Sequence, residues 1–151
     1  MNTKHTLKEY AGALSRAGLL TASTLTPALE NAAIDCLSYD TRTLYGTSLF
    51  LCKGAHFKED YLRAALAQGA VAYVAEKPYA VDAPHLLVRD IRHAMVVLGQ
   101  LFYDRVTDKL TSIGITGTKG KSTTAYYVRS ILNDYLTSEG KPQCAILSSI
   151  D

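Results

Sequence analysis

The hydrophobic pattern first becomes helical just after the N-terminus. Thr6 and Glu9 have the spacing of a capping box, in which each side chain accepts a hydrogen bond from the other residue's backbone N–H. The apolar residues that follow recur at the spacing of one helix face: Leu7, Tyr10, Ala11 and Leu14. Gly18 stands where such a helix commonly ends. The pattern predicts an N-terminal helix, followed by a loop over residues 19–33.

From residue 34 onward, short apolar runs alternate with helical patterns. The runs that predict strands are 34–39, 48–52, 70–75 and 85–88. Helical spacing covers 57–68, and a second helix is expected from an N-cap at Asp90 to about Tyr103. Strands that alternate with helices indicate an α/β fold with a mainly parallel sheet flanked by helices.

A polar stretch over 104–109 then separates this pattern from a new one. The apolar run 110–116 predicts a strand, 121–136 a helix, and 144–147 a further strand. A single β-α-β unit cannot cover both faces of its own sheet. We therefore expect an N-terminal α/β domain over 1–107, and over 108–151 the first β-α-β unit of a truncated P-loop ATPase domain.

The candidate chemistry lies between the predicted strand and helix of this second part. The loop consists of Gly117, Thr118, Lys119, Gly120, Lys121, Ser122 and Thr123. A glycine turn that opens a helix presents several backbone N–H groups to one point, where the helix dipole also favours negative charge. Lys121 is placed to reach the β- and γ-phosphates of ATP as the catalytic cation, and the Ser122 hydroxyl to coordinate Mg²⁺.

Two other interpretations of the loop are disfavoured by its sequence. The general P-loop pattern asks for a glycine at position 115, where this chain has Ile115. That departure disfavours a P-loop kinase or a generic nucleotide triphosphatase. A glycine turn that binds nothing is disfavoured because a buried strand precedes Gly117 and an amphipathic helix follows Lys121.

The loop, read from Thr116 to Thr124, resembles the ATP loop of the Mur ligases and of their folylpolyglutamate synthetase relatives. Four upstream segments narrow the resemblance to one branch of this family: 38–42, 49–50, 53–57 and 68–76. In order along the chain, they are similar to the N-terminal domain of the Mur ligases that add the third residue of the peptidoglycan stem peptide.

The resemblance implies an ATP-dependent ligase of peptidoglycan precursor synthesis. ATP would phosphorylate the D-glutamate γ-carboxylate of UDP-N-acetylmuramoyl-L-Ala-D-Glu, and the amine of a diamino acid, with L-lysine favoured, would attack the acyl phosphate. The resemblance implies that the family's substrate-binding positions in this chain bind the uridine end of the substrate. They are Tyr39, Thr41, Ala55, His56 and Phe57. Residues 1–107 would then be the UDP-sugar-binding domain, and 108–151 the start of the central ATP-binding domain.

At two positions the chain departs from the residues that many family members have. Thr41 stands where many members have serine, which keeps the hydroxyl, and Lys119 stands where many have asparagine. The family's remaining Mg²⁺ ligands and its amino-acid site lie beyond residue 151, so the chain alone is expected to be inactive.

Other functions remain open at this point. One is a non-catalytic nucleotide-sugar-binding module; another is a folylpolyglutamate synthetase-like ligase fragment, which the roughly one hundred residues before the loop disfavour. Asp40 and Arg42 are equally interpretable as a surface ion pair at a strand end, and His56 as a structural histidine.

The composition mainly argues against certain classes of partner and of metal site. The 151 residues are 48% hydrophobic and carry a formal net charge of +2, with no run of like charges, which favours neither nucleic acid nor a membrane surface as partner. The cysteines, Cys36, Cys52 and Cys144, sit in apolar runs without metal-ligand spacing. We expect a cytoplasmic monomer that acts on small molecules.

Overall fold

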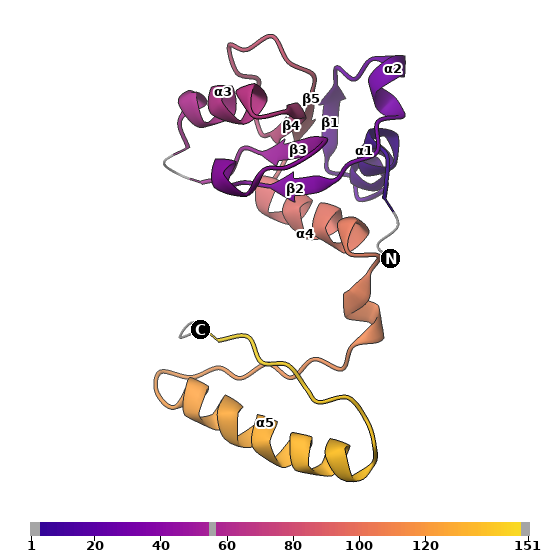
Figure 1. Cartoon of the computed structure of the whole chain (residues 1–151). Helices are drawn as coiled ribbons and strands as arrows, with labels where there is room; N and C mark the ends of the chain where they lie inside the picture. The colour runs from indigo at the N-terminus through magenta and orange to yellow at the C-terminus, as the bar shows by residue number, and fades with distance from the viewer. Residues whose placement is uncertain (1–3, 55–56, 149–151) are drawn as a thin grey trace. The chain divides into compact units, whose positions relative to one another are not determined.

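The computed structural model describes residues 4–54 and 57–148, which divide into two compact units, 1–110 and 111–151. In the first unit the elements follow one another as α1 (Leu7–Arg16), β1 (Leu20–Ser23), α2 (Pro27–Glu30), β2 (Cys36–Ser38), the 3₁₀ turn η1 (Thr41–Thr43), β3 (Ser48–Leu51), α3 (Glu59–Ala67), β4 (Ala70–Ala75), β5 (His85–Val88), α4 (Ile91–Phe102) and the 3₁₀ turn η2 (Val106–Lys109) (Figure 1). The predicted α/β class is confirmed.

The five strands form one sheet in the order β1-β5-β4-β3-β2. Strands β2 to β5 pair in parallel; in the central pair, Leu49 stands opposite Ala72 and Phe50 opposite Tyr73. Only β1 runs antiparallel, at the edge beside β5. The sheet is therefore mainly parallel, and the carboxyl ends of β2 to β5 lie along one edge of it.

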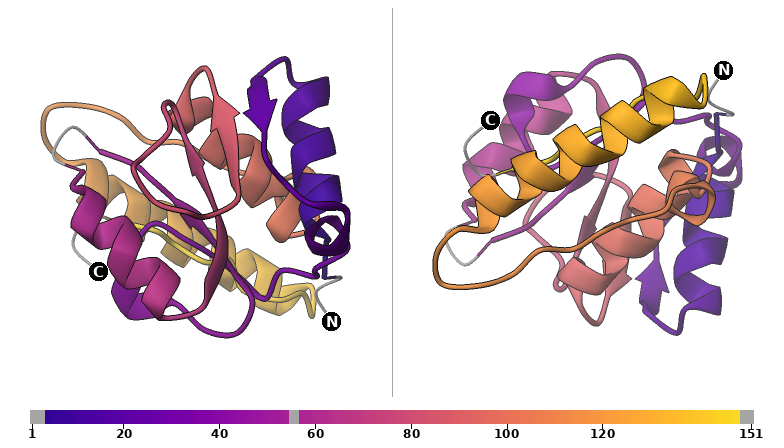
Figure 2. Two further views of the ribbon diagram at one scale, coloured as in Figure 1. Left: turned by 90° about the horizontal axis from the view of Figure 1, so that it is seen from above. Right: turned by 90° about the horizontal axis from the view of Figure 1, so that it is seen from below.

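Alternate residues of the strands divide the core between two helical layers (Figure 2). Side chains on one face pack with α1 and α4: Leu49, Leu51, Ala72, Val74, Leu86 and Val88. Side chains on the other face pack with α3: Phe50, Cys52, Tyr73 and Ala75. Parallel strands covered on both sides must be apolar at nearly every position, which is why 70–75 reads as one continuous apolar run.

The N-termini of α1 and α4 are capped by the residues that the sequence predicted as caps. Thr6 and Glu9 form the predicted capping box, with the Thr6 N–H 2.7 Å from the Glu9 carboxylate. At α4 the Asp90 carboxylate accepts from the N–H groups of Arg92 and His93. Each cap satisfies donors that a helix leaves open at its N-terminus.

The predicted loop over 19–33 is wrong in part, because it contains β1 and α2. Strand β1 has only one half-buried residue, Leu20, so it lacks the apolar alternation that reveals a strand in sequence. Its pairing with β5 is a tertiary effect. Helix α2 is a single turn that starts at Pro27, where the missing N–H costs nothing.

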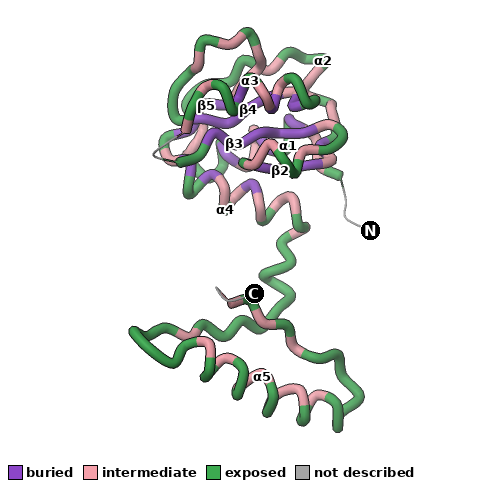
Figure 3. Tube along the Cα trace, turned by 60° about the vertical axis from the view of Figure 1, so that its left-hand side comes forward, coloured by how far each residue is buried: buried purple, intermediate pink, exposed green. Residues whose placement is uncertain are grey.

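In the second unit the helix α5 spans Lys121–Ser138, close to the predicted 121–136. The predicted strands 110–116 and 144–147 are not formed in the described structure, where both segments are irregular chain. A strand is defined by ladder hydrogen bonds to a neighbour, and neither segment has a strand partner among the described residues. No described residue of 111–148 is buried, in contrast to the sheet of the first unit (Figure 3).

Candidate functional site

The glycine loop leads into α5 through two residues with positive φ. Gly117 has φ +150° and Gly120, the N-cap of α5, has φ +75°, both in the region that side chains disfavour. The first intrahelical bond runs from Thr124 N–H to the Gly120 carbonyl, at 2.9 Å. By helix geometry, the N–H groups of Lys121, Ser122 and Thr123 therefore point out of the N-terminus toward the loop.

The two polar side chains of the loop turn back over it. Lys121 Nζ donates to the Gly117 carbonyl at 2.8 Å, and the Ser122 hydroxyl lies 3.5 Å from that of Ser148. Both residues line a cleft of about 350 Å³, whose apolar wall includes Ile115 and Val128. The lysine and the serine therefore line a cleft that runs along α5 from its first turn.

These residues fit the phosphate chain of ATP. The backbone donors of the first helical turn converge on one point, and Lys121 is held by a single exposed hydrogen bond that a phosphate oxygen can replace. Among residues 4–54 and 57–148, no group of three or more His, Cys, Asp or Glu side chains is placed to hold a metal ion. Within the loop, the Ser122 hydroxyl is the side chain that would coordinate Mg²⁺.

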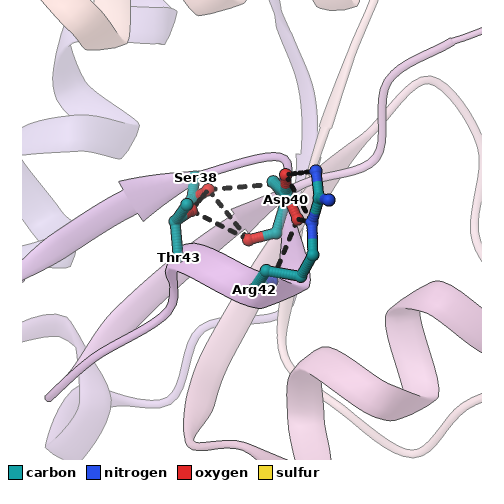
Figure 4. Close-up of polar contacts among 4 residues, drawn as sticks. All are labelled: Ser38, Asp40, Arg42 and Thr43. Carbon is teal, nitrogen blue, oxygen red and sulfur yellow. Dashed lines mark hydrogen bonds and ion pairs between the residues drawn. The ribbon is translucent and has the colours of Figure 1, made fainter.

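The second candidate site lies where β2 ends. The Ser38 and Thr43 hydroxyls lie 2.7 Å apart, within hydrogen-bond distance, and the Asp40 carbonyl oxygen lies 3.1 Å from the first and 3.0 Å from the second as a further acceptor (Figure 4). The Asp40 carboxylate accepts from the Arg42 N–H at 2.9 Å and from both Nε and Nη2 of its guanidinium. The Ser38–Thr43 segment is thereby fixed as a rigid turn.

The ion pair sets the titration of Asp40. The Arg42 guanidinium and backbone N–H hold the pKa of the Asp40 carboxyl down at about 2, despite opposition from partial desolvation. Arg42 itself is 86% exposed on its side chain. The interpretation as an exposed ion pair at a strand end therefore agrees with the geometry, and the pair shapes the turn that carries Tyr39 and Thr41.

The predicted uridine residues fall into three groups. Tyr39 is 57% exposed directly after β2, and Lys53 Nζ lies 4.5 Å from its ring centroid. Thr41 opens η1 beside it and is half-buried. Phe57 packs into an aromatic cluster, with its ring 5.4 Å from that of Tyr79, so part of its role is structural. Ala55 and His56 lie outside the described residues.

The structure thus places Tyr39 and Thr41 just after the carboxyl end of β2, on the usual ligand edge of a parallel sheet. It adds Lys53, which the sequence analysis did not single out as a site residue. A lysine between a buried strand and Gly54 was the available signal, but only the folded chain shows its contact with the Tyr39 ring.

The remaining candidate groups are structural. Cys36 and Cys52 are buried, and burial raises the pKa of the Cys52 thiol to about 12, so Cys52 is not a reactive thiolate. The Cys144 backbone N–H donates to the Asn133 side-chain oxygen at 2.7 Å, and Cys144 is half-buried. The helices described here are all too short or too polar to cross a bilayer.

Comparison with known proteins identifies the relatives. No family model matches the chain. It is 44% identical over 129 residues to the UDP-N-acetylmuramoyl-L-alanyl-D-glutamate--L-lysine ligase of Enterococcus faecalis, covering 85% of this chain and 25% of that protein. It is 43% identical over 120 residues to the UDP-N-acetylmuramyl-tripeptide synthetase of Lactobacillus delbrueckii subsp. bulgaricus, covering 78% of this chain and 22% of that protein.

A solved structure shares the fold at lower identity. MurF from Acinetobacter baumannii matches with a TM-score of 0.63 over 91% of this chain and 28% of its own, at 24% identity. The two relatives at 43–44% identity show that the chain is homologous to part of the Mur ligases, which confirms the resemblance seen in the sequence, and the solved structure shows the shared fold. Within that class, the curated relatives named above are the enzymes that make the UDP-N-acetylmuramoyl tripeptide, and the chain spans about a quarter of their length.

Proposed function

We propose that this chain provides the nucleotide-sugar site and the ATP loop of a ligase that adds a diamino acid, L-lysine favoured, to UDP-N-acetylmuramoyl-L-Ala-D-Glu. The reaction is amide-bond formation through an acyl phosphate on the D-glutamate γ-carboxylate. The observation that carries the proposal is the 44% identity over 129 residues to a lysine-adding ligase, in a chain whose glycine loop opens α5.

The ATP loop has the role that its geometry supports best. The N–H groups at the start of α5 bind the phosphates, Lys121 neutralises the β- and γ-phosphates, and Ser122 contributes one ligand to Mg²⁺. When bound, ATP supplies the phosphoryl group that activates the carboxylate. Positive charge from Lys121 favours transfer because negative charge spreads over the phosphoryl oxygens during the reaction. Lys119, exposed beside the loop, adds long-range attraction only.

The first unit has the role of the substrate-binding domain. Tyr39 and Thr41 bind the uridine end at the carboxyl edge of β2, supported by the rigid turn between Ser38 and Thr43. Phe57 and the neighbouring residues 55–56 complete this side of the site. In this proposal residues 1–107 form the UDP-sugar domain and 108–151 begin the central ATP domain.

The second unit is proposed to be completed by further strands of that domain. Its helix α5 exposes Tyr127 and Ile131, each 69% exposed, and the segments 110–116 and 144–147 lack strand partners in the described structure. In a complete α/β domain such groups are covered by a sheet and by a second helical layer. The chain alone is therefore expected to bind its ligands weakly and to form no product.

Titration of the 151-residue chain with UDP-N-acetylmuramoyl-L-Ala-D-Glu, followed by NMR, tests the proposal. The signals of Tyr39, Thr41 and Phe57 should shift first, and ATP should instead shift the loop from Gly117 to Ser122. Tyr39→Ala should weaken binding of the nucleotide sugar, whereas Tyr103→Ala, at an equally exposed tyrosine of the same unit, should not. Uridine nucleotides that leave residues 39–41 unmoved while shifting only the glycine loop would contradict the assignment.

A further inference from the structure

A histidine near the start of the chain contacts the turn that follows α4. His5 Nε2 lies 3.0 Å from Asp104 Oδ1, across 99 positions of sequence, and His5 Nδ1 lies 3.4 Å from Glu9 Oε1. The side chain of His5 is 15% exposed and that of Asp104 is 27% exposed. The imidazole ring therefore lies between two carboxylates, one from α1 and one from the chain that leaves α4.

The histidine side of this contact is fixed by the backbone. The His5 carbonyl oxygen accepts from the Ile34 N–H at 2.9 Å, and the Leu7 N–H donates to the Ala32 carbonyl oxygen at 3.0 Å. The side chains of Leu7 and Ile34 are both buried in the core. The His5 backbone is therefore anchored independently of what its ring contacts.

The other side of the contact is a turn that depends on the contacts around it. Asp104 and Arg105 have φ of +51° and +52°, in the left-handed region that residues with a side chain disfavour. Such backbone persists where surrounding contacts hold it. The Arg105 N–H donates to the Gln100 carbonyl oxygen at 2.6 Å, and the Arg105 guanidinium pairs with Asp108 at 2.7 Å. The chain passes through this turn before the second unit begins at residue 111.

Among the described groups of this cluster, His5 titrates closest to neutral pH, with an ordinary pKa of 6.5. The backbone hydrogen bond of the capping box lowers the pKa of the Glu9 carboxyl, which is therefore ionised at that pH. Burial raises the pKa of Tyr10, whose ring meets that of His5 edge to face, so its hydroxyl stays neutral. The nearby Lys4 ammonium is paired with Asp35 at 2.7 Å.

The geometry favours the protonated form of the His5 ring. Partial burial lowers the pKa of His5, but the hydrogen bonds to Asp104 and Glu9 outweigh it and raise the pKa above 6.5. A protonated imidazole donates from both nitrogens, one to each carboxylate, whereas a neutral ring donates from one nitrogen and turns a lone pair toward the other carboxylate. The stabilisation is therefore fully present below pH 6.5 and is lost as the pH rises through the higher folded value.

We propose that His5 is a pH-sensitive latch: its protonated ring fastens the turn after α4 to the N-terminal segment, and its neutral ring releases the turn. On release, Asp104 and Arg105 lose a contact that holds their left-handed backbone. The latch lies past the C-terminus of α4, a helix of 12 residues, about 18 Å long, that starts at the carboxyl edge of the sheet. It is thus separate from the proposed nucleotide-sugar site and does not rest on the proposed function.

NMR titration of the whole 151-residue chain tests the latch. The His5 ring signals should titrate at higher pH than in the urea-unfolded chain, and the Arg105 and Val106 amide signals should shift with the same midpoint. Asp104→Asn should lower that midpoint, because the ring loses one carboxylate partner. Asp108→Asn is the matched control, because it removes a carboxylate of the same turn that pairs with Arg105. It should leave the His5 midpoint unchanged.

Amide hydrogen exchange, corrected for its intrinsic pH dependence, measures the release of the turn. Each unit by which the contact raises the His5 pKa should increase opening of the turn about tenfold from well below the midpoint to well above it. In His5→Gln, whose side chain does not titrate, the protection of residues 104–106 should be the same at both pH values.

Two results would overturn the latch. If Asp104→Asn leaves the His5 midpoint where it is in the unsubstituted chain, the two side chains are not coupled. If the midpoint falls as expected but the protection of 104–106 in the unsubstituted chain is equal on both sides of it, the ion pair forms without controlling the turn. Neither result bears on the nucleotide-sugar site or the ATP loop, so the proposed function is tested separately.

Discussion

Lys121 Nζ donates a hydrogen bond of 2.8 Å to the carbonyl oxygen of Gly117, so the first residue of α5 closes back on the first glycine of the loop. The ammonium is thus held against the glycine loop that precedes the N-terminus of α5. A phosphate bound there meets a cation that is already in place and gives up one exposed hydrogen bond.

Lys121→Ala should weaken binding of inorganic phosphate or ATP to the chain by about 1–3 kcal/mol, the scale of a lost charge-assisted hydrogen bond. The backbone donors remain, so binding should not vanish. Phosphate titration followed through the Gly117 and Gly120 amide signals measures the change.

Lys119→Ala is the control for charge alone. Lys119 is exposed in the same loop and precedes the helix, so its removal should change the affinity less than the loss of Lys121. Equal losses in the two variants would mean that the loop attracts anions only through its net charge.

The two units should differ in stability. Residues 70–75 form a strand paired on both sides and almost wholly buried, whereas 110–116 is irregular and exposed apart from the half-buried Ile115. Local opening therefore costs far less free energy in 110–116. Native-state hydrogen exchange should show strong protection of 70–75 and little of 110–116; equal protection would count against this account.

Asp40 makes stability depend on pH in the acid range. Its folded pKa of about 2 lies below the usual 3.8, so the unfolded chain binds the proton more tightly. The stabilisation from the Arg42 pair is fully present above about pH 4 and is lost as the pH falls toward 2. Unfolding of the Asp40→Asn variant should lack this part of the acid dependence. An NMR midpoint near 4 for the Asp40 carboxyl would show that the pair does not form.

Leu62 tests the packing of α3 on the sheet. Its side chain is fully buried among Phe50, Tyr73 and their neighbours. Leu62→Ala should lower the free energy of unfolding by about 2–5 kcal/mol through lost burial and a residual cavity. Leu147→Ala, at a leucine that is 99% exposed, should change it by less than about 0.5 kcal/mol. Denaturant unfolding of the two variants makes the comparison.

In the first unit, the sequence predicted those elements whose hydrophobic pattern matches the burial of their side chains in the fold. Residues 70–75 and 85–88 form strands with the predicted bounds, because their apolar runs are buried between two helical layers. Strand β1 was missed because it is an exposed edge strand, set by its pairing with β5. The run 110–116 has the composition of a strand, but the described structure offers it no partner.

The two candidate sites also differ in how far the sequence alone could predict them. The glycine loop could be placed from sequence because its chemistry lies in consecutive residues at a helix start. The carboxyl-edge site could not be completed, since Tyr39 and Lys53 are separated in the sequence and meet only because β2 and β3 pair in parallel. Phe57 was expected at the substrate, and the structure adds an aromatic packing role.

The central proposal is tested most directly by tripeptide formation in a chimera that joins this chain to the rest of the Enterococcus faecalis ligase. The chimera with the unsubstituted chain and the one with Lys119→Asn should both convert UDP-N-acetylmuramoyl-L-Ala-D-Glu, L-lysine and ATP to the tripeptide. Lys121→Ala should abolish product formation, because the phosphoryl group then lacks its principal cation. A Lys121→Ala chimera that makes tripeptide at the unsubstituted rate would contradict the ATP-loop assignment and the ligase function with it.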